Sequence, residues 1–355
     1  MNKPLVLLVF FGLCCATAEA QTSYAPVIAG RALSFPRDQG SHPQYRTEWW
    51  YVTGWLTSEA GESLGFQITF FRTKPNLTGE NPSAFAPSEI MIAHCALSDP
   101  KHGRLWQDQR IARSALGLAG AAEGDTRVWI GAWSLKHDGQ YVAQIAAEDF
   151  SLDLNLSETQ PVLINGDNGF SRKGPAEQAA SYYYSLPHMQ VTGTVSRKGS
   201  ASRATGEAWF DHEWSSDYLD AQAVGWDWIG INLEDGGALM AFQIRGVDGT
   251  RRWAGGTFRG GDGVMQVFAP ADVDFRAGRR WTSPRTGIAY PVEWSVRAGG
   301  HEFTLRPLLD DQENDTRLST GAIYWEGAVR ADDKGKSAGR GYLELTGYGE
   351  RLRLR

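Results

Sequence analysis

Three consecutive ionisable residues, Asp211, His212 and Glu213, stand in the middle of the chain and are followed by Trp214. Imidazole and carboxyl groups are common general acids and bases, and folds shift their pKa values most strongly at functional sites. Alternation along a strand places His212 on one face with Phe210 and Trp214, and both carboxylates on the other. We therefore predict that His212 is a catalytic base beside Trp214. The alternative is a buried histidine satisfied by a backbone carbonyl, with both carboxylates in solvent.

A second candidate is the carboxyl group between two indoles in Trp226-Asp227-Trp228. Burial disfavours the ionised form of an aspartate, so a buried Asp227 would keep its proton to higher pH and could act as a general acid. Trp226 and Trp228, with Phe210 and Tyr218, are the predicted ligand-binding residues, because aromatic side chains line cavities for apolar molecules. The alternative is an Asp227 that points outward beside two core tryptophans.

Other patterns that suggest chemistry are poorly placed. Residues 61–65 have the spacing of a nucleophile elbow, but they fill a turn between two predicted strands, where that motif needs a strand and then a helix. His94 and Cys95 are neighbours and would face opposite sides of a strand, which argues against a Cys–His pair. The remaining histidines lack metal-ligand spacing, so neither a metal nor a cofactor is expected. Only His212, with carboxylates remote in sequence, could supply a metal site.

The strands that carry these residues belong to a sequence that occurs twice. Phe66-Gln67-Ile68 recurs as Phe242-Gln243-Ile244, each after a tryptophan-rich segment and a glycine turn. A second similarity matches residues 191–209 with residues 325–344. This pattern indicates two homologous modules, in which the two Phe-Gln-Ile segments should occupy equivalent strand positions. The ionisable run at 211–213 has no counterpart in the second copy, so we look for function there.

Composition and patterning predict an all-β protein of two tandem barrel-like modules. Alternating apolar and polar residues recur along the chain, for example at 66–72 and 141–146, and no segment shows a convincing helical period. The 14 Trp and 41 Gly residues fit many strands joined by tight turns. We place an extended leader at 21–45, the first module at 46–216 and the second at 222–355.

Within this framework, two further features are expected. Glu48 and Arg72 lie near the ends of predicted strands in the first module and should form a structural ion pair at its rim. Segments rich in Pro, Asn and Ser predict long loops at 75–87 and at about 165–180.

Residues 1–20 have the pattern of a secretory signal peptide, with Lys3, an apolar run and the small-residue pattern Ala18-Glu19-Ala20. Their removal leaves Cys95 as the one cysteine, so the exported chain would form no internal disulfide. The net charge of -6 gives no basic surface for nucleic acid, and no later apolar run is long enough to span a membrane. We expect a periplasmic or secreted protein whose partner is a small apolar molecule. The oligomeric state stays open.

Several of these segments together resemble a known family. In chain order they are residues 48–54, 66–72, 93–99, 211–214 and 341–348. They are similar to the lipocalin-like secreted proteins related to carotenoid 1,2-hydratase (hydroxyneurosporene synthase), often labelled predicted secreted hydrolases. The resemblance covers nearly the whole mature chain and implies two lipocalin-like β-barrels.

The same resemblance implies site residues. In the hydratase branch a His-x-Trp pair, an Asp and a Tyr are functional, and His212 and Trp214 match the pair. Asp227 is matched to the functional Asp of that branch, and Asp220 is the alternative match. The Tyr corresponds to Tyr218 if Asp220 is the right match, and otherwise it has no clear counterpart.

Two functions fit these residues. A hydratase-like enzyme (a hydro-lyase) would add water to a C=C bond of an isoprenoid-like or lipid-like substrate, with Asp227 as proton donor and His212 as the base that activates water. The indoles of Trp214, Trp226 and Trp228 would stabilise the cation. A non-catalytic carrier would use the same aromatic side chains only as pocket walls, and an ester hydrolase is a third alternative. For an enzyme, we expect His212, Trp214 and Asp227 to converge on one pocket at or beside the module interface.

Overall fold

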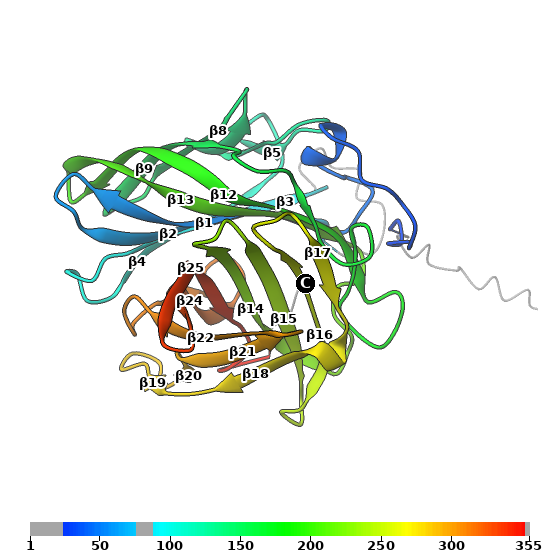
Figure 1. Ribbon diagram of the computed structural model, residues 1–355. Helices are drawn as coiled ribbons and strands as arrows, with labels where there is room; N and C mark the ends of the chain where they lie inside the picture. Colours follow the sequence, from blue (N-terminus) through cyan, green and yellow to red (C-terminus); the bar gives the residue numbers. More distant parts are fainter. Residues whose placement is uncertain (1–23, 76–87, 352–355) are drawn as a thin grey trace, which may run out of the picture.

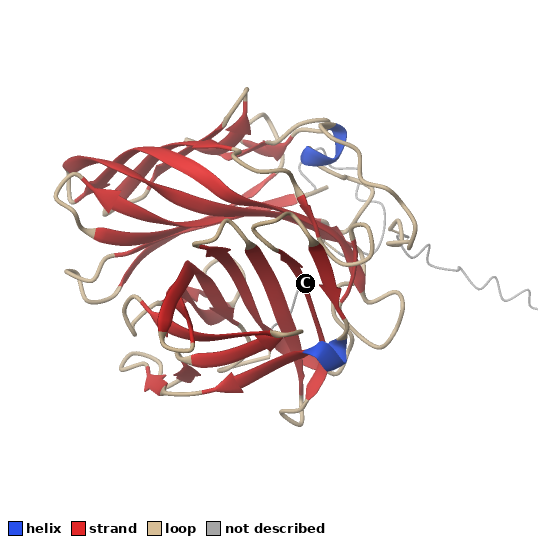
Figure 2. Ribbon diagram, viewed as in Figure 1, coloured by secondary structure: helices blue, strands red, loops and turns tan. Residues whose placement is uncertain are grey.

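The computed structural model describes residues 24–75 and 88–351 (Figure 1). The predicted signal peptide and nearly all of the predicted loop at 75–87 lie outside these ranges. Strands make up almost all of the regular structure, as Figure 2 shows, and the described residues add two short 3-10 helices, η1 (Arg37–Gln39) and η2 (Pro270–Asp272). None of these described helices is long and apolar enough to cross a membrane.

The first module is one antiparallel sheet that curls until β4 packs beside β5 and β6. Its strands within the described residues are β1 (Thr47–Ser58), β2 (Ser63–Thr73), β3 (Ile90–Ser98), β4 (Leu105–Arg113), β5 (Ala119–Ala121), β6 (Arg127–Ile130), β7 (Trp133–His137), β8 (Tyr141–Ala146), β9 (Phe150–Ser157), β10 (Leu163–Ile164), β11 (Phe170–Arg172), β12 (Ala180–Arg197) and β13 (Ser200–Ser215). The strand order is β4-β3-β2-β1-β13-β12-β9-β8-β7-β6-β5, with β10 and β11 also paired to β12.

The second module is another curled antiparallel sheet, in which β15 and β16 pack against β18. Its described strands are β14 (Ala223–Leu233), β15 (Ala238–Gly246), β16 (Arg251–Arg259), β17 (Met265–Phe268), β18 (Val273–Ala277), β21 (Trp294–Ala298), β22 (His301–Pro307), β23 (Glu313–Thr316), β24 (Ala322–Asp333) and β25 (Lys336–Leu345). A separate hairpin joins β19 (Arg280–Thr282) and β20 (Ala289–Pro291). The order β17-β16-β15-β14-β25-β24-β22-β21-β18 repeats that of the first module from β4 to β7.

The matching strand orders confirm an all-β protein of two tandem lipocalin-like β-barrel modules. The Phe-Gln-Ile repeat lies on corresponding strands, β2 and β15, but the predicted equivalence of positions is wrong. Phe66 points into the core of the first barrel, whereas Phe242 points out of the second barrel toward the first. Because side chains alternate along a strand, a difference of one residue in alignment moves a motif to the opposite face.

Most predicted strands are present, with two differences of detail. The predicted strand at 128–135 is a hairpin of β6 and β7, because Gly131 turns the chain with a positive φ of 58°. The predicted loop at 165–180 contains the short strand β11, which pairs with β12 and places Lys173 directly after it.

The leader packs onto one end of the first barrel. The carbonyl of Gln39 accepts hydrogen bonds from Trp50 Nε1 at 3.3 Å and from Thr126 Oγ1 at 2.8 Å. A Cβ atom on Gly40 would lie 2.2 Å from the backbone nitrogen of Gly124, so only glycine permits this approach. These contacts fix the leader against the first barrel.

The buried side chains form two barrel cores and a third cluster where the modules meet. In Figure 1 the two sheets stack with β1, β12 and β13 of the first facing β14, β15 and β25 of the second. We call the side chains between these strands the contact layer. Its aromatic members include Tyr51, Trp55, Tyr183, Trp209, Trp228, Phe242 and Tyr342.

Candidate functional site

Four carboxyl groups lie in the contact layer. Those of Asp211 and Glu213 on β13 and of Glu326 on β24 are buried, and that of Glu344 on β25 is half-buried. Asp211 and Glu213 are two residues apart on one strand face. Glu326 and Glu344 are register partners on neighbouring strands. Like charges in such positions destabilise a sheet unless some of them are neutralised.

Asp211 is the best-defined of these acids. Its Oδ1 accepts hydrogen bonds from Trp209 Nε1 at 2.7 Å and Ser185 Oγ at 2.5 Å, and its Oδ2 accepts one from the Tyr183 hydroxyl at 2.8 Å. Burial disfavours the carboxylate more than these donors stabilise it, and the pKa of Asp211 rises to about 7. Asp211 thus titrates close to neutral pH, among aromatic rings.

Lys173 is the cation that faces these acids. Its Nζ lies 2.9 Å from Glu213 Oε1 and donates a hydrogen bond to Ser171 Oγ at 3.0 Å. The same ammonium lies 4.2 Å from the ring centroid of Phe242 and 4.8 Å from that of Tyr183. Burial lowers the pKa of Lys173 and raises that of Glu213, although each charge favours the other.

The two acids of the second module complete the cluster. Trp226 Nε1 donates a hydrogen bond to Glu344 Oε2 at 2.7 Å. Burial raises the pKa of Glu344, and the nearby charges of Asp211 and Glu213 raise it further. The pKa of Glu326 is raised by burial and by Glu344. The pKa of each of the four carboxyl groups is therefore raised, with burial as the main cause.

His212 points into the first barrel, with Phe210 and Trp214 on the same strand face as predicted. Its Nε2 lies 2.9 Å from Glu48 Oε1, and its Nδ1 lies 3.2 Å from the Tyr184 hydroxyl. The ring is completely buried, and burial lowers its pKa, so it is neutral at physiological pH. The partner of His212 is thus a carboxylate from β1, and the carbonyl partner considered above is not observed.

Glu48 also binds the leader. Its Oε1 lies 2.7 Å from His42 Nδ1, and its Oε2 accepts a hydrogen bond from Arg72 Nε at 3.0 Å. Arg72 Nη2 donates to the carbonyls of His42 and Tyr45. The predicted pair of Glu48 and Arg72 is confirmed, but it is fully buried beneath the leader and not at an exposed rim. This network ties the leader to the barrel.

The same network contains the residues that could hold a metal. One ligand atom each from His42, Glu48 and His212 lies within 4.8 Å of the others. Two imidazoles and a carboxylate suit zinc-type ions. In this structure hydrogen bonds among the three residues and the Arg72 guanidinium occupy these atoms, so the residues serve here as a hydrogen-bonded charge network.

Asp227 lies inside the second barrel. Its carboxylate contacts Arg245 Nε at 3.1 Å and accepts hydrogen bonds from Gln243 Nε2 at 2.7 Å and the Tyr348 hydroxyl at 2.8 Å. Burial raises its pKa as predicted, and the charge of Arg245 opposes that shift. The alternative match, Asp220, pairs with Arg252 at 2.8 Å and is partly exposed.

The expected convergence of His212, Trp214 and Asp227 on one pocket is wrong. His212 and Trp214 belong to the core of the first barrel, and Asp227 to the interior of the second, with the contact layer between them. Alternation is the physical reason: in each strand the residues next to these, such as Asp211 and Trp228, turn toward the other module.

The predicted ligand-binding residues divide in the same way. Phe210 packs in the first barrel against Tyr141, with ring centroids 5.0 Å apart. Trp228 belongs to the contact layer and Trp226 packs against it. The ring of Tyr218 meets that of Trp226 edge to face at 5.7 Å. Their role in ligand binding stays a prediction.

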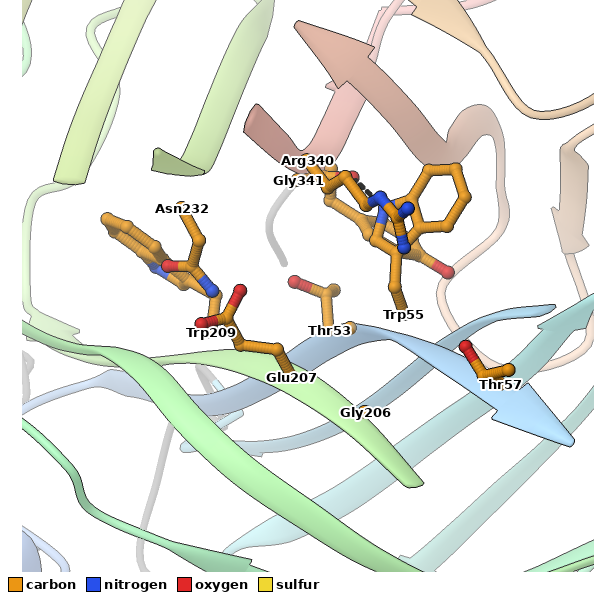
Figure 3. A pocket seen from close by; sticks show the side chains of 11 residues that line it. Thr53, Trp55, Thr57, Gly206, Glu207, Trp209, Asn232, Arg340 and Gly341 are labelled. Atoms are coloured by element: carbon orange, nitrogen blue, oxygen red, sulfur yellow. Dashed lines mark hydrogen bonds between the residues drawn. The ribbon is translucent and has the colours of Figure 1, made fainter. Parts of the chain in front are cut away.

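Two hollows reach the contact layer from outside. The larger, of about 590 Å³, is lined mainly by apolar and aromatic side chains, among them Phe170, Phe242, Trp253 and Phe268. Ser171 and Phe242 also line it, and both contact Lys173. The smaller, of about 140 Å³, lies between β1, β13 and β25 (Figure 3). Trp209, which donates to Asp211, forms part of its wall.

A serine and a histidine also meet between the modules. Ser319 Oγ lies 2.9 Å from His94 Nε2, while the Tyr324 hydroxyl lies 3.1 Å from His94 Nδ1. Burial lowers the pKa of His94 to about 3. The single hydroxyl proton of Ser319 has two other acceptors within reach, Gln109 Oε1 at 2.6 Å and the Thr316 carbonyl at 3.2 Å. So weak a base, with a tyrosine in place of a carboxylate as its third member, gives the ester hydrolase alternative little support.

Sequence reasoning missed Lys173, Glu326 and Glu344 as members of this site. In the sequence, Glu344 stands out only because the internal repeat matches its segment with the strand that precedes Asp211. Lys173 falls within a predicted loop, where nothing indicates that it faces an acid. One sequence signal points to such partners. Alternation along β13 places Asp211 and Glu213 on the same face, so a segment that covers this face must supply polar or charged partners for them.

A family model described as AttH-like matches residues 26–348. The crystal structure of an AttH-type protein from Nitrosomonas europaea is 52% identical, with a TM-score of 0.86 and coverage of 91% of this chain and 99% of that chain. Kievitone hydratase from Nectria haematococca is 15% identical (TM-score 0.69, 93% and 97% covered), and CghA is 12% identical (TM-score 0.55, 93% and 97% covered). At these lower identities the likeness shows the fold alone.

A search of curated proteins found no match. The family match spans both barrels and the contact layer between them, and it confirms the resemblance to lipocalin-like proteins related to carotenoid hydratase. The chain belongs to the AttH-like family.

Proposed function

We propose that this protein adds water to a C=C bond, or removes it, in a small and largely apolar molecule bound between the two modules. Asp211 is the proton donor. The observation that carries the proposal is the burial of Asp211 among aromatic rings, with a pKa of about 7. Protonation of an alkene needs an acid that still holds its proton near neutral pH, and a surface aspartate does not.

In the forward direction, the proton of Asp211 forms a new C–H bond at one alkene carbon, and the other carbon becomes a cation. The π-faces of Trp209, Trp228 and Tyr183 stabilise that charge. Water then forms the C–O bond and loses a proton, which returns to the Asp211 carboxylate and restores the enzyme. Dehydration is the same sequence in reverse.

The larger hollow supports a small apolar ligand. Its volume of about 590 Å³ lies in the range of small-molecule sites. Most of its lining residues are apolar, and the charged residues Asp167, Arg172 and Glu177 also line it. Its inner residues, Ser171 and Phe242, contact Lys173, which pairs with Glu213 beside Asp211. The shared fold of kievitone hydratase, a hydratase by name, is in keeping with this reaction class.

A carrier is the second candidate, and one observation favours it. The residues that line the two hollows do not include the four carboxyl groups. A substrate therefore reaches Asp211 only if Phe242 or Trp209 moves aside, whereas a carried ligand needs no such movement. In a carrier, the protonated acids would serve only to hold the modules together.

The test is turnover in water enriched in oxygen-18. Purified protein is incubated with acyclic isoprenoid alkenes and their tertiary alcohols, and mass spectrometry records products that gain or lose one water. We expect the native protein to incorporate the heavy oxygen and Asp211→Asn to lose at least about a hundredfold in rate. Asp153→Asn, on an exposed position of β9, is the matched control. Ligand binding without incorporation would support the carrier, and equal rates in Asp211→Asn would refute the assigned acid.

A further inference from the structure

Two arginines from neighbouring strands lie over the indole of Trp55, beside the smaller cavity. Arg330 of β24 and Arg340 of β25 are register partners, and their guanidinium carbons lie 5.0 and 5.3 Å from the Trp55 ring centroid. Like charges directly opposite each other on a sheet are destabilising. Partial burial lowers the pKa of Arg330, and the charge of Arg340 lowers it further. The fold thus holds two exposed cations side by side.

The protein does not supply the matching anion. In the described parts of the chain, neither guanidinium lies within 4.0 Å of a carboxylate oxygen. Glu207, the acid that lines the cavity, is engaged by His188, whose Nδ1 lies 2.5 Å from Glu207 Oε1. Burial lowers the pKa of His188, but its bonds to Glu207 and the Gly237 carbonyl outweigh this and raise it overall. Glu207 is therefore paired with His188 and not with either arginine.

The cavity beside the arginines offers further donors. Figure 3 shows Arg340 and Trp55 on one side and Thr53, Thr57 and Glu207 on the other. Neither threonine hydroxyl makes a hydrogen bond with the residues that the structure describes. The volume of about 140 Å³ is that of about five water molecules, which suits a small charged group and not a whole lipid.

We propose that this cavity binds an oxyanion, either a free phosphate or the carboxylate of a small organic acid. Arg340 lines the cavity and supplies a cation there, and Thr53 and Thr57 supply hydroxyl donors. Arg330 does not line the cavity, but it lies over the same indole and adds a second positive charge beside it. The planar guanidinium fork matches the oxygen geometry of both groups, and the indole of Trp55 holds the two forks in place. The inference is independent of hydration chemistry, because it assigns binding at a different place in the interface.

The test is isothermal titration calorimetry on the folded, full-length chain at low ionic strength, with inorganic phosphate and with sodium benzoate. We expect at least one of them to bind, and binding to weaken as salt is added. Arg330→Met and Arg340→Met should each weaken binding at least tenfold. Arg127→Met is the matched control, because Arg127 is also an exposed arginine over a tryptophan, 5.5 Å from the ring of Trp129.

The outcomes separate the two sources of the anion. Binding of benzoate alone identifies an organic carboxylate, and binding of phosphate alone identifies free phosphate. No binding of either probe, or equal binding in Arg340→Met and Arg127→Met, overturns the proposal. Thermal unfolding gives a second test that needs no ligand. Because Arg330→Met removes the repulsion between the two arginines, its melting temperature should equal or exceed that of the native protein. A lower melting temperature would show that the pair stabilises the fold.

Discussion

At the scale of single residues, Asp211 and His212 are neighbours in the chain with opposite surroundings. Alternation turns His212 into the first barrel, where Glu48 holds it, and turns Asp211 into the contact layer, where burial keeps it protonated. The His-x-Trp pair therefore lies in the buried network around Glu48 and His42, and its catalytic role stays a prediction. The acid with a pKa suited to proton transfer stands one position before it.

Replacing Glu48 tests the structural role of this network. Glu48→Gln removes the fully buried carboxylate that Arg72 and His42 share. Arg72 keeps Glu89 and His42 keeps Asp38 as partners, so we expect the free energy of unfolding to fall by about 3 kcal/mol. Urea unfolding followed by tryptophan fluorescence measures it. Glu62→Gln is the control, since Glu62 pairs with Arg197 at the surface and should cost at most about 1 kcal/mol. Equal losses in the two variants would contradict the assignment.

The pKa of Asp211 predicts a pH dependence of stability. Burial raises this pKa to about 7, above the value in the unfolded chain, so the folded state binds the extra proton between pH of about 4 and 7. The stabilisation that protonated Asp211 gives to the folded state is fully present below about pH 4 and is lost as the pH rises through about 7. In Asp211→Asn the decline should be shallower by up to about 1.4 kcal/mol per pH unit. Unfolding curves measured from pH 4 to 8 check this, and identical slopes would refute it.

At the scale of elements, the first and last long strands of each barrel pair with each other, β1 with β13 and β14 with β25, and at one glycine in each pair the two backbones lie very close together. A Cβ atom on Gly206 would lie 1.9 Å from the Trp55 carbonyl oxygen, and one on Gly341 would lie 1.9 Å from the Gly230 carbonyl oxygen. Gly206→Ala and Gly341→Ala should each lower the free energy of unfolding by about 1–3 kcal/mol. Gly300→Ala, with open space around its Cβ, should change it by less than about 0.5 kcal/mol in the same urea assay. An equal effect at all three glycines would disprove the backbone explanation.

At the scale of the whole molecule, the contact layer makes the two barrels one cooperative unit. Trp228 is buried against Tyr51, Trp209 and Tyr183 of the other module. We expect a single unfolding transition by fluorescence and by circular dichroism, and a loss of about 3–5 kcal/mol in Trp228→Ala. Two separate transitions in the native protein would show that the barrels unfold independently.

Export is also a property of the whole chain. We propose that residues 1–20 are removed during secretion and that the mature protein begins at Gln21. Intact mass spectrometry of the protein recovered from the periplasm or medium measures the new terminus. A mass that includes Met1 would refute this prediction.

The sequence by itself determined the features that depend on local pattern. Period-2 alternation predicted the strands and grouped His212 with Phe210 and Trp214, and the internal repeat predicted two modules. Alternation separates the two faces of a strand, but it does not say which face meets the other module. That choice, which brings Asp211 and Glu344 into one layer and leaves Asp227 outside it, depends on how the barrels dock. Only the tertiary structure decided it, because contacts between residues far apart in the chain follow from sheet register and packing and not from neighbouring residues.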